Sequence, residues 1–337
     1  MKGKLENNNR LWVTWETQRR NVTLSKKLNA ELVELGVNAA NIIRYPYLSV
    51  KTLLLVMRRR PRVLFVQNPS LILAALASFI GKISKIHIVI DAHNAGIFPL
   101  EGRFNALNNL ALTANRFADV VIVSNDNLKE YLVERGVRSV VIPDPIPTIS
   151  KGLSTSLDRA KFNIVYVCSW SSDEPYAEVI RATDLLDDTI RIYITGKVQE
   201  DIIVDSFRDN NKLFLTGYLT NEEYESLLSS CDAVMVLTER ENCLLCGAYE
   251  GAAVEKPLIL SDTIILRSYF DKGAVYTKNS AKEISIAIMN AKDEHHRLQS
   301  EVKLLKGQCE KVFQERLGVL DEYINRTLVE SSDNRKI

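Results

Sequence analysis

The sequence predicts two tandem α/β domains, each built on a doubly wound parallel sheet, and three observations lead to this fold class. Short apolar runs of strand length alternate with segments of helical spacing along almost the whole chain, which is the pattern of a parallel sheet covered by helices. The alternation pauses at 143–161, where proline and serine are frequent and one glycine occurs, and then begins again. A length of 337 residues is enough for two ordinary domains with complete cores.

In the first half, the apolar runs that we expect to be strands lie at 11–15, 63–66, 87–90, 120–123 and 140–142. Leucines follow helical spacing over 21–35, and Gly36 is a suitable residue to end that helix. Further helices are expected at 71–83, 104–117 and 127–135. These elements predict an N-terminal domain over 1–147.

In the second half, the expected strands lie at 163–167, 190–194, 212–215, 233–237, 258–260 and 274–275. Helical segments separate them, and helical spacing continues over 281–328 before a polar tail. The boundaries that follow are a linker at 148–161 and a second domain at 162–310.

The composition is that of an ordinary soluble protein, with 46% hydrophobic and 25% charged residues. A formal net charge of +1 gives no reason to expect nucleic acid as a partner. The five cysteines form no evident disulfide framework, and residues 1–9 lack the apolar core of a signal peptide, so we expect a cytoplasmic protein. Cys243 and Cys246 lack the second ligand pair that a zinc site needs.

Ligands of open α/β sheets bind beyond the carboxyl ends of the strands, so the loops after the strands are the candidate sites. After the first strand, Arg19 and Arg20 could clamp a phosphate, or they could belong to a solvated helix start. After the strand at 87–90, His93 could bind a sugar hydroxyl or act as a base near neutral pH. Asp91 could orient that histidine or serve as the base itself, and a structural histidine is the alternative.

Three loops of the second domain carry further candidates for binding a donor. The loop at 168–174 contains Ser169 and Trp170, and its serines and backbone N–H groups could face a diphosphate, although Asp173 and Glu174 there also make an ordinary helix start. Lys197 follows the next strand and could neutralise a departing diphosphate. Tyr218 lies in a turn that could frame a base through backbone contacts, or that is a plain β-turn.

The segment 231–262 is the most informative, because an apolar strand runs into a polar loop and then into a helix. The loop holds Glu241, Asn242, Cys243 and Leu244, and Glu250 lies about one turn inside the helix. The start of a helix offers unpaired N–H groups and the positive end of its dipole to an anion. A carboxylate one turn further can hold sugar hydroxyls. The combination indicates a phosphate and a polyol bound together, as in a nucleotide-sugar.

Two motifs that are common in other nucleotide-binding proteins do not occur. The chain has neither GxGxxG nor GxxxxGK[ST], which weighs against a dinucleotide dehydrogenase and a P-loop enzyme. No DxD-type pair ends a predicted strand of the cleft. We therefore expect no cofactor and no metal ion.

Three motifs in matching order and spacing resemble known enzymes. DAHN at 91–94 is similar to DWHN, CSWSSDE at 168–174 to TSWTxDED, and ITGK at 194–197 is shared, all with the chitobiosyldiphosphodolichol beta-mannosyltransferase family. The arrangement as a whole resembles the GT-B glycosyltransferases, and within them the retaining family with an E-x7-E loop. The resemblance extends over about 11–291.

The resemblance implies a fold and a set of residue roles. Two Rossmann-like domains would face each other across a cleft, and a C-terminal segment at 311–337 would return to the first domain. Lys197 would contact the donor diphosphate, Glu250 would match the second glutamate of E-x7-E and hold the donor ribose, and His93 would lie beside the transferred sugar. Where the family has its first glutamate this chain has Asn242, and Glu241 is one place away.

The expected function is therefore a metal-independent glycosyltransferase of hexosyltransferase type. It would move a sugar from a nucleotide-diphosphate sugar to a glycan or lipid-linked acceptor in surface polysaccharide or glycoconjugate synthesis. The alternatives are a non-catalytic nucleotide-sugar-binding subunit and a sugar-nucleotide epimerase on the same fold. Basic residues such as Lys51 and Arg58 flank apolar helices of the first domain, so peripheral contact with an anionic membrane is a further expectation, with a solvated charged face as its alternative.

Overall fold

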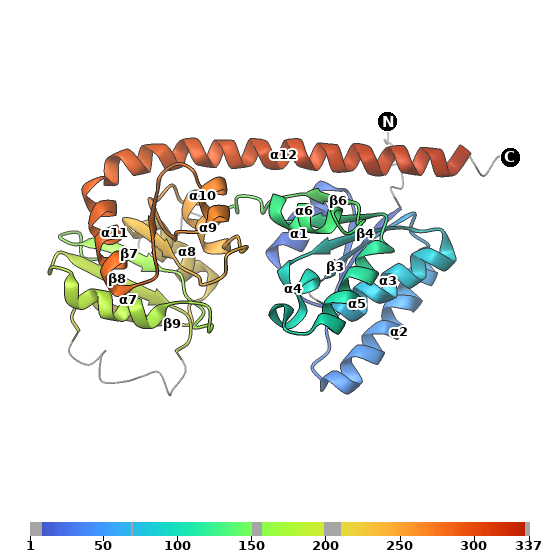
Figure 1. Cartoon of the computed structure of the whole chain (residues 1–337), viewed down its shortest axis with the longest axis horizontal. Coiled ribbons are helices and arrows are strands. Elements are labelled where there is room, and N and C mark those ends of the chain that lie inside the picture. The colour runs from blue at the N-terminus through green and yellow to red at the C-terminus, as the bar shows by residue number, and fades with distance from the viewer. Residues whose placement is uncertain (1–8, 69, 150–156, 199–209, 334–337) are drawn as a thin grey trace. The chain divides into compact units, whose positions relative to one another are not determined.

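The structure is a computed structural model, and it describes residues 9–68, 70–149, 157–198 and 210–333. The chain forms two compact units (Figure 1). Unit 1 comprises Met1–Asp144 and Phe313–Ile337, and unit 2 comprises Pro145–Val312. Each unit contains one parallel sheet of six strands, so the predicted fold class of two doubly wound α/β sheets is confirmed.

The sheet of unit 1 has the strand order β2-β1-β3-β4-β5-β6, with every neighbouring pair parallel. Its strands are β1 (Arg10–Thr14), β2 (Glu31–Glu34), β3 (Val63–Asn68), β4 (His87–Ala92), β5 (Val120–Val123) and β6 (Ser139–Val141). The central strands consist almost entirely of buried residues, because helices cover both faces of the sheet.

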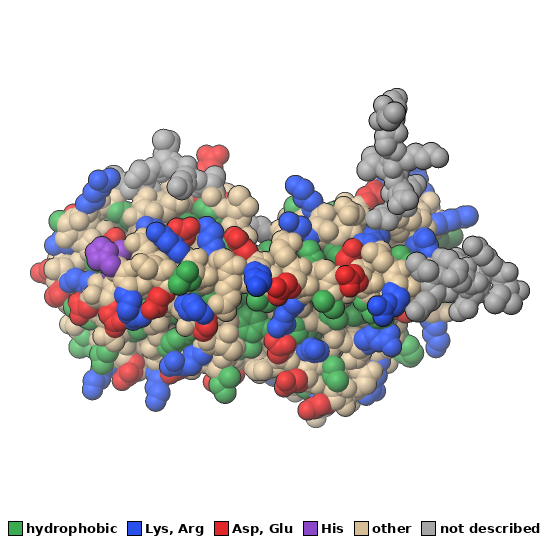
Figure 2. Space-filling model, turned by 90° about the horizontal axis from the view of Figure 1, so that it is seen from above, with side chains coloured by type: hydrophobic (Ala, Val, Ile, Leu, Met, Phe, Trp, Pro, Cys, Tyr) green, Lys and Arg blue, Asp and Glu red, His purple; other side chains and the backbone are tan. Residues whose placement is uncertain are grey.

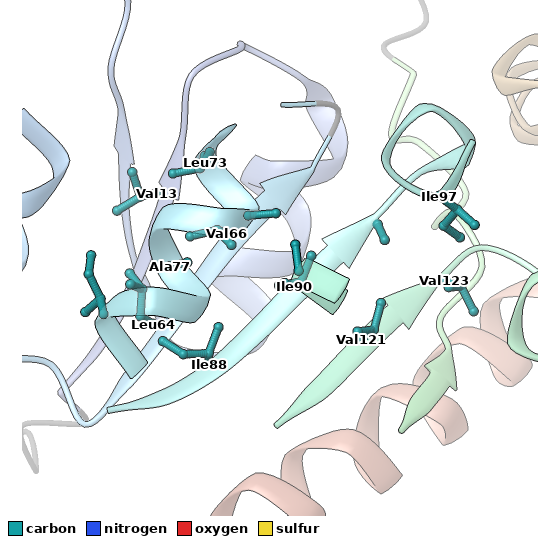
Figure 3. Close-up of a cluster of buried hydrophobic side chains, with 14 of the residues drawn as sticks. Val13, Leu64, Val66, Leu73, Ala77, Ile88, Ile90, Ile97, Val121 and Val123 are labelled. Atoms are coloured by element: carbon teal, nitrogen blue, oxygen red, sulfur yellow. The ribbon is translucent and has the colours of Figure 1, made fainter. Parts of the chain in front are cut away.

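The helices of unit 1 divide between the two faces of the sheet. They are α1 (Arg19–Lys27), α2 (Asn41–Arg59), α3 (Leu71–Ser84), α4 (Asn94–Ile97), η1 (Pro99–Gly102), α5 (Asn105–Arg116) and α6 (Asp126–Val133). On one face, alternate strand residues pack with buried residues of α2, α3, α5 and α6, and Figure 3 shows part of this cluster, including Leu64, Ile90 and Leu73. On the other face, Trp12 and Phe65 pack with Leu24 of α1 and with Leu28, which directly follows that helix.

The predicted helix over 21–35 is wrong in its second half. α1 ends at Lys27, Asn29 adopts a left-handed φ of 51°, and Glu31–Glu34 forms the edge strand β2 beside β1. The leucine spacing continued by chance through two elements. Pairing of β2 with β1 outweighs local helix propensity there, since tertiary context routinely overrides that propensity.

Unit 2 repeats this plan with the strand order β12-β11-β10-β7-β8-β9, again all parallel. Its strands are β7 (Phe162–Tyr166), β8 (Ile190–Thr195), β9 (Leu213–Gly217), β10 (Ala233–Val236), β11 (Leu258–Ser261) and β12 (Ala274–Thr277). Its helices are α7 (Tyr176–Ala182), η2 (Thr183–Leu185), α8 (Asn221–Ser230), α9 (Cys246–Ala253), α10 (Ile264–Tyr269) and α11 (Ala281–Asp293). All six strands lie where the sequence predicts them.

The last helix, α12 (His295–Asp333), takes part in both units. Its early residues Val302 and Leu305 pack into the core of unit 2, whereas Phe313 and Leu320 pack into the core of unit 1 that contains Trp12. The predicted return of the C-terminal segment to the first domain is therefore confirmed. In the part of the chain that the structure describes, no helix combines the length and the apolar character that crossing a bilayer requires.

Candidate functional site

Ligands of doubly wound sheets bind beyond the carboxyl ends of the strands at the point where the strand order reverses. In unit 1 the order reverses between β1 and β3, and β4 lies next to β3. In unit 2 it reverses between β7 and β10, with β8 next to β7. The candidate residues that follow these strands therefore lie at the switch point of each unit, and each unit is described by itself below.

Arg20 lies in the first turn of α1 and is buried in unit 1. Its guanidinium donates to both carboxylate oxygens of Asp91 at 3.0 Å. It also donates to Asp144 Oδ1 at 2.7 Å and to the carbonyl oxygens of Ile142 and Pro143. All three nitrogens are thus engaged. The structure gives Arg20 this internal role in place of the phosphate contact that the sequence predicts, whereas the side chain of Arg19 lies outside the described residues.

The charges in this cluster stabilise one another. Burial alone would lower the pKa of Arg20, but Asp91 and Asp144 outweigh it, so the pKa is raised. Burial would likewise raise the pKa of Asp91, but Arg20 and then His93 reverse the effect and hold the pKa of that carboxyl well below its usual range. A buried carboxylate that stays ionised and has both oxygens bonded is suited to orienting a neighbour. The geometry supports that role for Asp91 over the role of base.

His93 follows β4 directly and is the N-terminal flanking residue of α4, with its side chain 30% exposed. Its Nε2 lies 3.7 Å from Asp91 Oδ2 and 3.4 Å from Gln67 Nε2. Gln67 is itself oriented, because its Oε1 accepts hydrogen bonds from Thr14 and Asn21. Both neighbours of the imidazole therefore meet the same ring nitrogen. Nδ1 makes no hydrogen bond to the residues that the structure describes.

In unit 2, the motifs at 168–174 and 194–197 lie against each other. The Thr195 hydroxyl accepts from the backbone N–H of Cys168 at 3.0 Å, and the Trp170 indole Nε1 donates to the Thr195 carbonyl at 3.0 Å. Gly196 has φ +86°, and a Cβ placed on it would come within 2.4 Å of the Cys168 carbonyl oxygen. Only glycine permits this close approach between the two loops.

Trp170 is 2% exposed, adopts a left-handed φ of 63° and lies beside the Tyr176 ring. Its indole supports the loop from inside, in place of the donor contact that the sequence predicts. Burial, followed by the charge of Glu174, also raises the pKa of the Cys168 thiol to about 12, so this cysteine stays neutral at physiological pH.

The loop after β7 forms an anion cradle, and a side chain of the same loop fills it. The backbone N–H groups of Ser169 and Ser171 donate to the Glu174 carboxylate at 2.8–3.1 Å, and the Ser169 hydroxyl donates to it at 3.0 Å. These are the donors that the sequence assigns to a diphosphate. In this structure Glu174 occupies them.

Asp173 connects the two loops of the unit 2 switch point. Its carboxylate accepts from Ser171 and from the Thr238 hydroxyl at 2.9 Å, and it lies 3.3 Å from Arg240. Its carbonyl oxygen accepts from the backbone N–H of Glu239 at 2.7 Å. Burial would raise the pKa of Asp173, but the hydrogen bonds from Ser171 and Thr238 prevail, and the pKa is lowered. The start of the 237–245 loop is thereby fixed.

α9 begins at Cys246, at the far end of that loop, and packs very closely on the sheet. A Cβ on Gly247 would lie 3.0 Å from Val167, and one on Gly251 would lie 2.5 Å from Leu258. The glycines, with Ala248 and the other small residues of this helix, let its backbone approach the strands. Close packing places the first turn of the helix at the carboxyl edge of the sheet.

Glu250 is half-buried on α9, and the Tyr224 hydroxyl of α8 donates to its Oε2 at 2.5 Å. In the preceding loop, Glu241 and Asn242 are exposed. Cys243 is half-buried, and Leu244 is buried in the core of unit 2, which anchors the loop. Of these residues, Glu250 is held in a defined position by a polar partner.

Lys197 and Tyr218 are both exposed at the carboxyl edge of unit 2. Tyr218 is 87% exposed after Gly217, whose φ is +68°. Lys197 follows Gly196 and forms no ion pair within the described ranges. Among the described residues, no three His, Cys, Asp or Glu side chains are grouped so that they could hold a metal ion.

Three comparisons place this architecture among known proteins. No family model matches the chain, and no curated protein matches it in sequence. Solved structures do match. Sucrose-phosphate synthase from Thermosynechococcus elongatus shares 11% identity with a TM-score of 0.76, over 96% of this chain and 100% of that chain. Anabaena HepE in complex with UDP-glucose shares 15% identity with a TM-score of 0.69, over 96% and 92% of the two chains.

The chain has the GT-B fold. A protein proposed to be a UDP-N-acetylglucosamine 2-epimerase from Listeria monocytogenes also matches, at 10% identity and a TM-score of 0.62, over 90% of this chain and 94% of that chain. At such identities the likeness establishes the GT-B fold and leaves the reaction to be argued from the site.

Several residues that shape the site are not evident from the sequence. Gln67 and Asp144 in unit 1 are buried or half-buried partners of predicted residues, and Tyr224 in unit 2 holds Glu250. Gln67 carried a signal, since a polar residue at the end of an apolar strand needs a partner when it is buried. Tyr224 gives no such signal in the sequence, because its contact with Glu250 joins residues that are 26 positions apart and lie on two different helices.

Proposed function

We propose that this GT-B chain is a glycosyltransferase that moves a sugar, most simply a hexose, from a nucleotide-diphosphate sugar to a glycan or lipid-linked acceptor. The observation that carries the proposal is the first turn of α9 at the unit 2 switch point, with Glu250 fixed by Tyr224. A helix start suits a diphosphate, and a positioned carboxylate suits the hydroxyls of a ribose. The likeness to a protein solved with UDP-glucose supports this class of donor.

The residues divide into roles that follow from their surroundings. Lys197 is exposed beside the β7 loop, where its charge can neutralise the diphosphate as it leaves. His93 presents Nδ1 to the acceptor side, and Asp91 keeps the imidazole oriented. Glu241 and Asn242 are exposed in the loop where the resembling E-x7-E family has its first glutamate, and we assign them to the transferred sugar.

The proposed reaction forms one bond and breaks one bond. An acceptor hydroxyl oxygen bonds to the anomeric carbon, the bond from that carbon to the diphosphate oxygen breaks, and the nucleotide diphosphate leaves with the electron pair. The hydroxyl proton passes to a base or to the departing phosphate, depending on whether the configuration is inverted or retained. We further propose that transfer needs no divalent metal, because no DxD-type pair follows a strand, and chelation with EDTA should leave turnover unchanged.

The test begins with donor binding. UDP-, GDP- and ADP-glucose are compared for their effect on the melting temperature, since a ligand that binds only the folded state stabilises it. One of them should raise the melting temperature in the wild type, and Glu250→Ala should reduce that shift. Lys303→Ala, at an exposed lysine of α12, is the control for Lys197→Ala. Turnover unchanged in Lys197→Ala, or no binding of any nucleotide-sugar, would contradict the proposal.

Acceptor panels separate the rival functions. Donor binding without transfer to any acceptor would indicate a nucleotide-sugar-binding subunit. Release of free nucleotide diphosphate or an isomerised sugar without acceptor would indicate an epimerase, the class proposed for the Listeria structure. We expect the reaction to take place in the cytoplasm, and with a lipid-linked acceptor at a membrane surface, as part of surface polysaccharide or glycoconjugate synthesis.

A further inference from the structure

The outer surface of the helix layer formed by α2, α3 and α5 is unusual for its exposed apolar side chains. On α2, Ile43, Tyr47, Val50, Leu54 and Met57 follow the i, i+4, i+7 spacing that places them on one stripe, and all five are exposed. Met57, for example, is 62% exposed. Because α2 uses its opposite side for the core of unit 1, the stripe is not needed for folding.

The neighbouring helices continue the apolar stripe. On α3, Ile72, Phe79 and Ile83 lie at helical spacing, with Phe79 60% and Ile83 63% exposed. Phe117, which ends α5, is exposed as well. These helices cover the same face of the unit 1 sheet, so their outer sides form one surface, which we call the α2–α3 face. Single exposed apolar residues are ordinary, but stripes on adjacent helices mark an interaction surface.

The charge on this face has one sign. No Asp or Glu occurs between Glu34 and Asp91, although the chain as a whole is close to neutral. Lys51 and Arg58 are one heptad apart and lie on the side of α2 next to the apolar stripe, and both are exposed. The face that carries α12 differs from the α2–α3 face, because acidic and basic side chains are interspersed on it (Figure 2).

A groove of about 1030 Å³ opens at the end of the α2–α3 face, beside the starts of β3 and β4. Met57, Ile83 and Phe117 line it and belong to the apolar surface as well. Cations also line it, among them Lys82 and Lys85. The groove lies at the amino ends of the strands, opposite the edge that carries His93.

Among the residues that the structure describes, Asp119 is the acid that lines this groove. Asp119 accepts a hydrogen bond from the backbone N–H of Ile88 at 2.7 Å and lies 3.5 Å from His87 Nδ1. Its single negative charge is outnumbered by the four cations that line the groove, which are Arg60, Arg62, Lys82 and Lys85. The groove offers apolar walls beneath a rim that is predominantly basic.

We propose that the α2–α3 face binds the surface of an anionic phospholipid bilayer, with lipid phosphates against the basic rim and α2 lying in the interface. Apolar stripes bordered by cations match a surface that is apolar beneath a layer of negative charge. A nucleic acid would use the cations but not the apolar stripes. All residues of the α2–α3 face belong to unit 1, and the proposal does not depend on the proposed reaction.

The test is co-flotation of the whole chain with vesicles of phosphatidylcholine alone and of phosphatidylcholine with phosphatidylglycerol. Wild type should float only with the anionic vesicles, and added salt should weaken the binding. The double variant Lys51→Glu and Arg58→Glu should lower binding more than tenfold, since each cation near an anionic surface contributes roughly fivefold. The control makes the same change of charge at Lys26→Glu and Lys27→Glu, which are exposed on α1 on the other face of the sheet, and should leave binding unaltered.

A second pair tests the apolar contribution. Leu54→Ser with Met57→Ser should weaken flotation while leaving the melting temperature unchanged, because both side chains are exposed. Leu304→Ser with Val319→Ser, at exposed positions of α12, is the matched control. Equal loss in test and control variants, equal binding to neutral vesicles, or no binding at all would overturn the proposal. A dimer in solution that dissociates in the Leu54→Ser variant would also overturn it, since a second copy of the chain would then cover the α2–α3 face.

Donor-induced stabilisation is measured on the same variants and should persist in all of them. Lipid binding without any response to nucleotide-sugars would support the proposed membrane-binding surface and contradict the proposed reaction. The opposite pattern, stabilisation by a nucleotide-sugar without lipid binding, would contradict only the proposed membrane-binding surface.

Discussion

The two units hold the loops at their switch points by different means. Unit 1 places a cation inside the protein, and the Arg20 guanidinium joins Asp91 and Asp144. Unit 2 uses the half-buried carboxylates of Glu174 and Asp173, which backbone N–H groups and hydroxyls satisfy. The first arrangement is a buried network in which each charge depends on the others. The second is assembled from local hydrogen bonds.

The difference explains why the sequence is misleading about anion binding in both units. An arginine such as Arg20 and the serines of the β7 loop are reasonable phosphate ligands, yet here the protein's own carboxylates accept their hydrogen bonds. The first turn of α9 and the exposed Lys197 are the groups that we propose for a donor phosphate. A hydrogen-bond donor in such a loop is therefore a candidate phosphate ligand only if no carboxylate of the protein already accepts from it.

The largest loss of unfolding free energy is expected when Arg20, the buried cation of unit 1, is replaced. Arg20→Ala would leave Asp91 buried and ionised without its partner, which costs about 3–5 kcal/mol of unfolding free energy. Urea denaturation measures it, and Lys26→Ala, at an exposed lysine of the same helix, should cost less than about 0.5 kcal/mol. A loss of less than about 1 kcal/mol in Arg20→Ala would show that the network contributes little.

The next effect tests the close approach of the two unit 2 loops. Gly196→Ala adds left-handed strain and a contact with the Cys168 carbonyl, for a loss of about 2–4 kcal/mol. Gly217→Ala is the matched variant, because Gly217 has a similar φ of +68° but nothing near its missing Cβ. It should cost about 1–2 kcal/mol. Equal losses at the two positions in urea denaturation would mean that the loop contact is not tight.

A smaller loss is expected from the filled cradle. Glu174→Ala would leave the N–H groups of Ser169 and Ser171 to water, at a cost of about 1–2 kcal/mol, with Glu174→Gln intermediate. Glu222→Ala on the exposed start of α8 is the control. Thermal unfolding compares the three variants. If Glu174→Ala were as damaging as Arg20→Ala, the contrast between a buried network and local bonds would not hold.

The smallest expected effect is a change in how steeply the stability falls in acid. The folded-state pKa of Asp91 lies below its unfolded value of about 3.9, so its stabilisation is complete above about pH 4 and is lost as pH falls through the folded pKa. Asp91→Asn should be less stable than wild type at neutral pH, and its stability should fall less steeply in acid. Unfolding curves between pH 7 and pH 3 test this, and parallel slopes would contradict it.

Much of the fold follows from patterns that are local in sequence. Apolar runs identify the strands of unit 2, because each is buried on both faces of a parallel sheet. β2 was missed since its Leu32 continued the helical spacing of Leu24 and Leu28. A strand of four residues at a sheet edge has too few buried side chains to leave its own pattern.

The sequence by itself determined the two α/β sheets, because periodicity needs only near neighbours in the chain, whereas the return of the C-terminal helix was implied by the resemblance to the GT-B enzymes. The tertiary structure alone decided which polar groups in the loops after the strands remain available. Arg20 meets Asp91 across 71 residues, and Trp170 turns inward to Thr195 across 25. Such pairings depend on which strands lie side by side, and the physical reason is that buried charges and donors must find partners wherever the fold provides them.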